Sequence, residues 1–86
     1  MVLMDPAPNP ASGNVRIQFA AFEAMRVELA IYNLVGEKVS QLFAGEVQSE
    51  TYTYGYDVSS FASGTYLLSL SSSTGERITK RLILLN

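Results

Sequence analysis

The sequence of 86 residues contains no cysteine and no histidine. Without cysteine no disulfide can reinforce the fold, and the redox compartment cannot be inferred from thiols. Without either residue, the usual general base, the thiol nucleophile and most metal-binding constellations are missing. The sequence therefore predicts a protein that is not an enzyme and that carries no cofactor.

Charge is also sparse, with six basic and eight acidic side chains and a net charge of −2. This balance offers no basic stripe to displace counterions from nucleic acid, so we expect no nucleic-acid partner. The longest apolar run near the end, Leu82 to Leu85, is far below the ~20 residues of a membrane span. Among the acidic residues, Asp57 and Glu50 are the one pair worth testing as catalytic carboxylates. We interpret them as solvated charges, with Asp57 capping a turn.

The distribution of apolar residues has a period close to two, which is typical of strands. With 48% hydrophobic and 16% charged residues, the chain should form one globular domain. Six to seven short strands with frequent turns predict an all-β fold, an Ig-like antiparallel β-sandwich. The expected strands cover residues 15–19, 27–32, 38–43, 51–56, 65–71 and 76–85.

The segments between these strands show turn residues rather than helical patterns. Residues 33–37 predict a turn in which Gly36 adopts a positive φ. Residues 44–46 and 72–75 are expected to be further connections. The stretch Ala20–Arg26 has weak helical character and is interpreted as a connection with at most one helical turn.

The two ends of the sequence differ in composition. Residues 1–12 have the composition of a linker, in which Pro8, Asn9 and Pro10 favour an extended, semi-rigid chain. Residues 1–10 lack the pattern of a signal peptide. Residues 13–86 are expected to form the sandwich, and both faces of its last strand become apolar after Arg81. That end should be covered on both sides or lie at an interface, as expected for a module at the C-terminus of a larger protein.

Four motifs occur in a characteristic order. They are Pro8-Asn9-Pro10, Ile31-Tyr32-Asn33-Leu34-Val35-Gly36-Glu37-Lys38-Val39, Phe61-Ala62-Ser63-Gly64-Thr65-Tyr66 and Lys80-Arg81-Leu82-Ile83-Leu84. In this order and spacing the chain resembles the C-terminal sorting domain (type A) of the type IX secretion system of Gram-negative bacteria. Two departures stand out. Tyr56 precedes the acidic Asp57 where family members often carry Trp, and the chain ends on Leu85-Asn86 where many members end on a basic residue.

The resemblance implies a secretion address rather than an activity. Its implied partners are an upstream cargo domain, the outer-membrane translocon and a sortase-like surface peptidase. The implied location is secreted or at the cell surface, reached through the periplasm. Two alternatives stay open: a structural domain like the Ig-like domain of flagellar hook-capping proteins, and an adhesion or carbohydrate-binding module. In the latter, Tyr52, Tyr54 and Tyr56 would stack sugars, although such a stripe is more often the inner face of a sheet.

Several residues are candidates for the sorting signal. They are Gly64, Tyr66, Lys80, Arg81, Leu82, Ile83, Leu84 and Leu85. For Gly64 and Tyr66 we favour a structural role, in which glycine permits a special backbone conformation and the tyrosine hydroxyl ties down a loop. Lys80 and Arg81 should face opposite sides of the last strand. They are either charges that discourage aggregation or part of a surface read by the translocon. An exposed edge could bind a partner strand by β-augmentation, and a second copy of the chain is one candidate for that partner.

Overall fold

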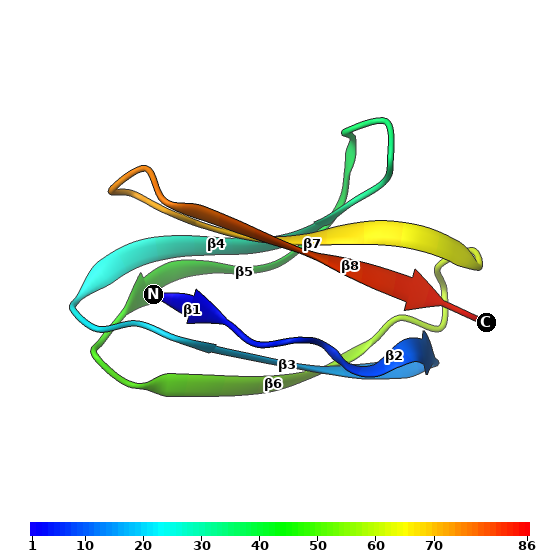
Figure 1. Cartoon of the computed structure of the whole chain (residues 1–86), viewed down its shortest axis with the longest axis horizontal. Helices are drawn as coiled ribbons and strands as arrows, with labels where there is room; N and C mark the ends of the chain where they lie inside the picture. The colour runs from blue at the N-terminus through cyan, green and yellow to red at the C-terminus, as the bar shows by residue number, and fades with distance from the viewer.

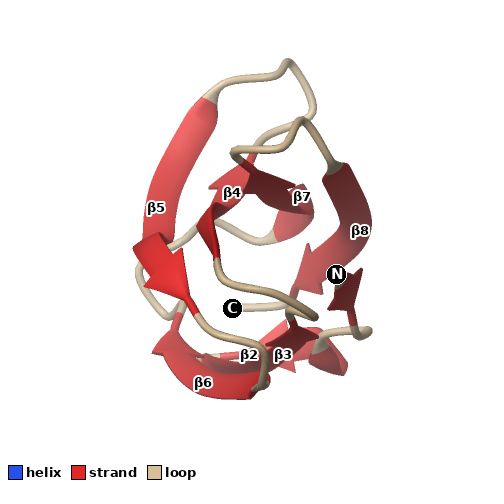
Figure 2. Ribbon diagram, turned by 90° about the vertical axis from the view of Figure 1, so that its left-hand side faces the viewer, coloured by secondary structure: helices blue, strands red, loops and turns tan.

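The computed structural model describes all 86 residues, in eight strands and no helix. The strands are β1 (Val2–Leu3), β2 (Ala7–Ser12), β3 (Asn14–Ala20), β4 (Met25–Tyr32), β5 (Lys38–Val47), β6 (Thr51–Asp57), β7 (Gly64–Ser72) and β8 (Arg77–Leu84). They form two layers that pack face to face (Figure 1, Figure 2). The predicted all-β sandwich is confirmed. No helix long and apolar enough to cross a membrane is found.

The two layers are joined through β2, which pairs in both. The upper layer in Figure 1 has the order β5-β4-β7-β8, while in the lower layer β3 lies between β6 and the two N-terminal strands β1 and β2. β2 is antiparallel to β3 and parallel to β8, where Ala11 lies opposite Leu84. All other strand pairs are antiparallel. The side of the sandwich next to β8 is therefore closed by the N-terminal segment.

The core follows from the period-two pattern, because alternate side chains of each strand face the opposite layer. The largest fully buried side chains come from both layers: Val15, Ile17, Phe19, Leu29, Ile31, Val47, Val58, Leu68, Leu70, Leu82 and Leu84. Full burial of a side chain of this kind contributes about 1.5–3 kcal/mol. In a chain with no disulfide, this apolar layer is the main source of stability.

One strand is longer than the sequence predicts. β5 continues through residues 44–46, which the sequence assigns to a connection, and the chain turns only after Val47. The reason is pairing with β4, where Val27 lies opposite Gly45 and Arg26 opposite Glu46. Register shifts in this pair explain the irregular apolar pattern of β5, since a bulge interrupts strict alternation.

The turn between β4 and β5 is organised by one asparagine side chain. Asn33 Oδ1 accepts hydrogen bonds from the backbone N–H groups of Val35 at 3.1 Å and Glu37 at 3.0 Å. Gly36 has a φ of +89°, as the sequence predicts. This loop rises from the upper layer in Figure 1, and Leu34 and Val35 at its tip are 65% and 79% exposed.

The N-terminal residues differ from the linker that the sequence predicts for residues 1–12. β1 pairs with β3, and the side chains of Leu3 and Ala11 are 5% and 0% exposed. The prolines hide this behaviour in the sequence, because proline disfavours a central strand. Proline is tolerated here because the pairing with β3 is interrupted between Ala7 and Ser12, and the side chain of Asn9 supplies the hydrogen bonds to β8. Residues 2–12 are thus packed on the sandwich in this structure.

The tyrosine stripe of β6 faces the core. Tyr52, Tyr54 and Tyr56 are half-buried and pack on the buried cluster. Phe19 stacks on Tyr52 with ring centroids 5.3 Å apart, and Phe43 of β5 stacks on Tyr54 at 5.8 Å. These aromatic rings fill the side of the sandwich between β5 and β6. The interpretation of the stripe as an inner sheet face is confirmed.

Burial raises the pKa of Tyr56 to about 12. The folded protein therefore holds this phenolic proton more tightly than the unfolded chain does. Between pH 10 and 12 the unfolded state loses the proton first, so the free energy of unfolding should fall as pH rises through this window. Tyr56→Phe should make that fall shallower, as measured by urea denaturation at each pH with circular dichroism. An equally steep fall in the variant would show that Tyr56 does not contribute.

Candidate functional site on the last strand

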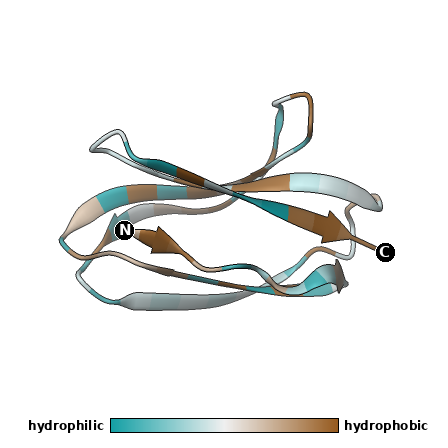
Figure 3. Cartoon of the chain, viewed as in Figure 1, coloured by the Kyte–Doolittle hydropathy of each residue, from teal (hydrophilic) through white to brown (hydrophobic).

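The last strand, β8, divides its side chains between the core and the surface. Leu82 and Leu84 are fully buried, whereas Ile83 is half-buried and Leu85, just beyond the strand, is 60% exposed. The end of β8 is the strongly apolar tip near the C-terminus in Figure 3. No element of the chain covers the outer side of Leu85. The sequence predicts that this end is either covered on both sides or lies at an interface. The first alternative is wrong for this chain, and the second stays a prediction.

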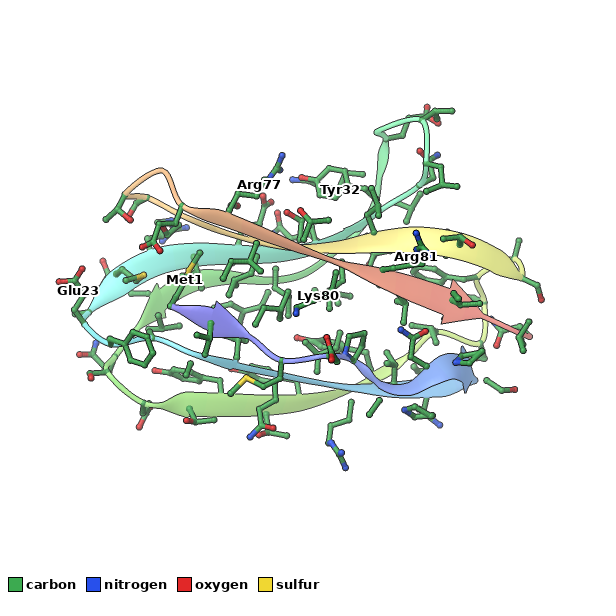
Figure 4. All side chains as sticks on the ribbon, viewed as in Figure 1. Met1, Glu23, Tyr32, Arg77, Lys80 and Arg81 are labelled. Carbon is green, nitrogen blue, oxygen red and sulfur yellow. The ribbon has the colours of Figure 1, made fainter.

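Lys80 and Arg81 lie on opposite faces of β8, as predicted (Figure 4). Lys80 is on the core side, and its Nζ reaches the rim, 3.2 Å from Asp5 Oδ1. Arg81 is exposed on the outer face. An inward-pointing charge near a strand edge discourages edge-to-edge aggregation. This geometry supports the protective role for Lys80, and it leaves Arg81 accessible to a partner.

The side chain of Asn9 takes the place of a strand residue along the edge of β8. Its Nδ2 donates to the carbonyl oxygen of Arg81 and its Oδ1 accepts from the N–H of Ile83, both at 2.9 Å. The backbone continues this pairing, because the N–H of Leu85 donates to the carbonyl of Ala11 at 2.9 Å. Asparagine suits this position since its amide carries both a donor and an acceptor. The Pro8-Asn9-Pro10 motif therefore covers the edge of the last strand.

Asn86 fastens the chain after β8 to two loops. Its Oδ1 accepts from the N–H of Gly13 at 3.0 Å, and its Nδ2 donates to the carbonyls of Val58 and Phe61, both at 2.8 Å. Its backbone exchanges two further hydrogen bonds with the hydroxyl of Ser63. The sequence analysis assigns no role to Asn86 or to the side chain of Asn9. A single asparagine carries no periodic signal, so neither contact could be read from pattern.

Gly64 and Tyr66 shape the loop that enters β7. Gly64 has a φ of +154°, which side chains other than glycine rarely adopt. The hydroxyl of Tyr66 donates to the carbonyl of Ala62 at 2.7 Å, and its ring meets Phe61 edge-on at 5.8 Å. The predicted loop-anchoring role of the tyrosine is confirmed. Because Gly64 lies opposite Leu84, this loop also positions the end of β8.

The carboxylates of Asp57 and Glu50 do not converge. Glu50 precedes β6 and Asp57 ends it, which separates their backbones by about 23 Å at the usual rise per residue. Asp57 Oδ1 accepts hydrogen bonds from the hydroxyl of Ser59 at 2.6 Å and its N–H at 2.9 Å, and these bonds lower the pKa of Asp57. The predicted turn-capping role is confirmed. No group of three His, Cys, Asp or Glu side chains is placed to hold a metal.

The first half of β8 has no ladder partner on the edge that faces away from β7. The bonds of Arg81 and Ile83 to Asn9 show that odd-numbered residues direct their backbone groups away from β7. Arg77 and Thr79 must do the same, because this direction alternates along an antiparallel strand. β2 reaches β8 in ladder pairing only at Leu84. The backbone groups of Arg77 and Thr79 therefore have no ladder partner, although β1 contacts β8 on this side of the sandwich.

Residues 7–85 match a family model described as the secretion system C-terminal sorting domain. The match includes β2 and all of the strands that follow it. No curated protein matches the chain.

The two asparagine contacts should contribute measurably to stability. Asn86→Ala leaves the N–H of Gly13 and the carbonyls of Val58 and Phe61 without their partner, and we expect a loss of about 1–3 kcal/mol in the free energy of unfolding. Asn9→Ala should cost a similar amount. Asn14→Ala, at an exposed position in β3, is the matched control and should stay within about 0.5 kcal/mol of the parent. Urea denaturation measures all three, and equal stability of Asn86→Ala and Asn14→Ala would contradict the anchoring role.

Proposed function

The chain belongs to the family of secretion system C-terminal sorting domains, and we propose that the outer surface of its last strand is what the secretion machinery reads. Domains of this family are C-terminal sorting signals for type IX secretion. The domain is thus an address, carried by a cargo chain with an upstream domain and used by the type IX machinery. It directs that cargo to the cell surface or beyond.

The observation that carries the proposal is that some side chains of β8 are buried or paired, whereas others are exposed on its outer face. Leu82 and Leu84 are buried in the core, so they are accessible to no partner while the domain is folded. Lys80 is paired with Asp5 at the rim. The residues left to a partner are Arg81, Ile83 and Leu85, which share the outer face at the end of the strand. We assign the signal to these three, with Gly64 and Tyr66 supporting them from β7 and its loop.

The edge of β8 without a ladder partner supplies a physical mode of recognition. A partner strand could pair with the backbone of Arg77 and Thr79, where main-chain hydrogen bonds provide affinity and neighbouring side chains provide specificity. The translocon is the partner we propose for this edge. A second copy of the chain could use the same edge, and it would then compete with the translocon.

The N-terminal segment bears on where cargo is released. Residues 2–12 pair with β3 or β8, and a peptidase needs an extended, accessible backbone. We propose that the connection cut by a sortase-like surface peptidase lies before Val2. In this proposal the cargo passes through the periplasm of a Gram-negative bacterium, and Pro8, Asn9 and Pro10 belong to the sorting domain.

The two alternative functions receive no specific support. The tyrosine stripe faces the core, which removes the observation that suggested a carbohydrate-binding module. Nothing in the matched family points to a flagellar hook-cap domain.

Replacing Leu85 with aspartate should separate the signal from the fold. Leu85 is 60% exposed, so Leu85→Asp should leave the urea midpoint of the domain almost unchanged. If a partner buries Leu85, the change should reduce export of a reporter carrying residues 1–86 at least about tenfold, since burial of a leucine is worth about 1.5–3 kcal/mol. Export is measured as surface-exposed reporter in a bacterium with a type IX system.

Phe22→Asp is the matched control, because Phe22 is 66% exposed in the β3–β4 connection at the opposite end of the sandwich. It should export like the parent. Deletion of residues 77–86 should abolish export, but that deletion also removes Leu82 and Leu84 from the core. Equal export of Leu85→Asp and Phe22→Asp would contradict the assignment of the signal to the outer face of β8.

A further inference from the structure

The outer face of the upper layer contains a small polar recess that the sorting role does not use. Its volume is about 170 Å³, and its lining residues are Tyr32, Gly36, Leu67, Ser69, Arg77 and Thr79. It lies beside the β4–β5 loop and over β7 and the first half of β8. This is the far half of β8 from Leu85.

Ser69 is the unusual member of this recess. It belongs to the outer face of β7, where Ala30 of β4 and Thr79 of β8 flank it in register. It is nevertheless only 4% exposed, and its hydroxyl has no hydrogen-bond partner. A buried hydroxyl without a partner is unfavourable, and most such groups are satisfied in native proteins. Ser69 is therefore a buried polar group whose hydrogen-bond partner no other residue of the chain supplies.

Arg77 of β8 and Tyr32 of β4 line the recess together with Ser69, and their side chains lie close to each other (Figure 4). One Nη of Arg77 donates to the hydroxyl of Tyr32 at 3.4 Å, and the guanidinium carbon lies 5.5 Å from the tyrosine ring centroid. The long distance marks a weak contact. The other N–H groups of the Arg77 guanidinium are free, because no carboxylate pairs with Arg77. Glu28, the acidic residue on the same face, is paired with Lys38.

We propose that this recess binds the carboxylate of an aspartate or glutamate side chain of a polypeptide partner. Arg77, Ser69 and Thr79 each have a side-chain donor, and all three residues line one small space with no acidic residue among them. A planar guanidinium fits a carboxylate in two-point contact. The charge at the mouth of the recess is therefore complementary to one acidic group.

Two features favour a polypeptide as the source of that carboxylate. The volume suits a carboxyl group on one or two methylenes and leaves little room for a larger ligand. The recess also ends at Gly36, and the neighbouring Leu34 and Val35 are largely exposed apolar side chains. A peptide presents acidic and apolar side chains on one strand, so it can use both surfaces. The proposal goes beyond the sorting role and does not rest on it.

Titration of the ¹⁵N-labelled chain with a capped peptide that contains one glutamate tests the proposal. The same peptide with glutamine in place of glutamate is the ligand control. Saturable shifts of the Ser69 and Thr79 amide resonances are expected with the glutamate peptide only. Arg77→Gln should weaken that binding about tenfold, which is the usual effect of losing a charge-assisted hydrogen-bond pair.

Arg16→Gln is the matched control, because Arg16 is exposed on β3 in the other layer and lies outside the recess; it should bind like the parent. Ser69→Ala removes the unpartnered hydroxyl, so it should fold at least as stably as the parent and bind the glutamate peptide about threefold more weakly. Equal shifts with both peptides, equal weakening by Arg77→Gln and Arg16→Gln, or unchanged binding by Ser69→Ala would each overturn the proposal.

Discussion

The structure depends on how one strand, β8, is held along both of its edges. β7 pairs with it from Gly64 to Ser71, and on the other edge Asn9 and Ala11 provide the hydrogen bonds near its end. These contacts fix the rotation of the strand about its axis. Once it is fixed, alternation sends Leu82 and Leu84 into the core and leaves Arg81 and Ile83 facing out. A slip of one residue would exchange the two sets.

The two open sides of the sandwich are closed by different chemistry. Between β5 and β6, aromatic rings from three strands stack and replace main-chain pairing. Next to β8, an N-terminal segment pairs with both layers, through β3 and through β8. The aromatic side is held by packing, whereas the β8 side is held by a few directional hydrogen bonds at Asn9, Ala11 and Asn86. Loss of Asn9 or Asn86 on the β8 side therefore removes several hydrogen bonds at once.

Much of the fold could be predicted from the sequence because it rests on repeated patterns. Alternating Val15, Ile17 and Phe19 identify a strand that has one buried face. Gly36, in the turn that follows Asn33, identifies a position with a positive φ. What escaped prediction rests on single residues or on pairing. β5 extends over Gly45 because β4 lies beside it, and residues 7–12 form a strand although they contain two prolines. Asn9 and Asn86 act through side-chain amides whose partners are more than twenty residues distant. Sequence periodicity carries no information about such contacts.

The surface proposed as the signal on the last strand exists only in the folded domain. In sequence, Arg81, Ile83 and Leu85 are interleaved with residues of the core, so an unfolded chain would not present them as one surface. Folding brings them together on one face and also brings Asn9, from the other end of the chain, against the edge between them. A partner protein that binds this surface must therefore bind the folded domain. Buried changes at Leu82 or Leu84 would disturb recognition only through the fold, whereas exposed changes at Leu85 would act on recognition directly. The signal as proposed is therefore a property of the folded end of the sandwich, rather than of a linear motif.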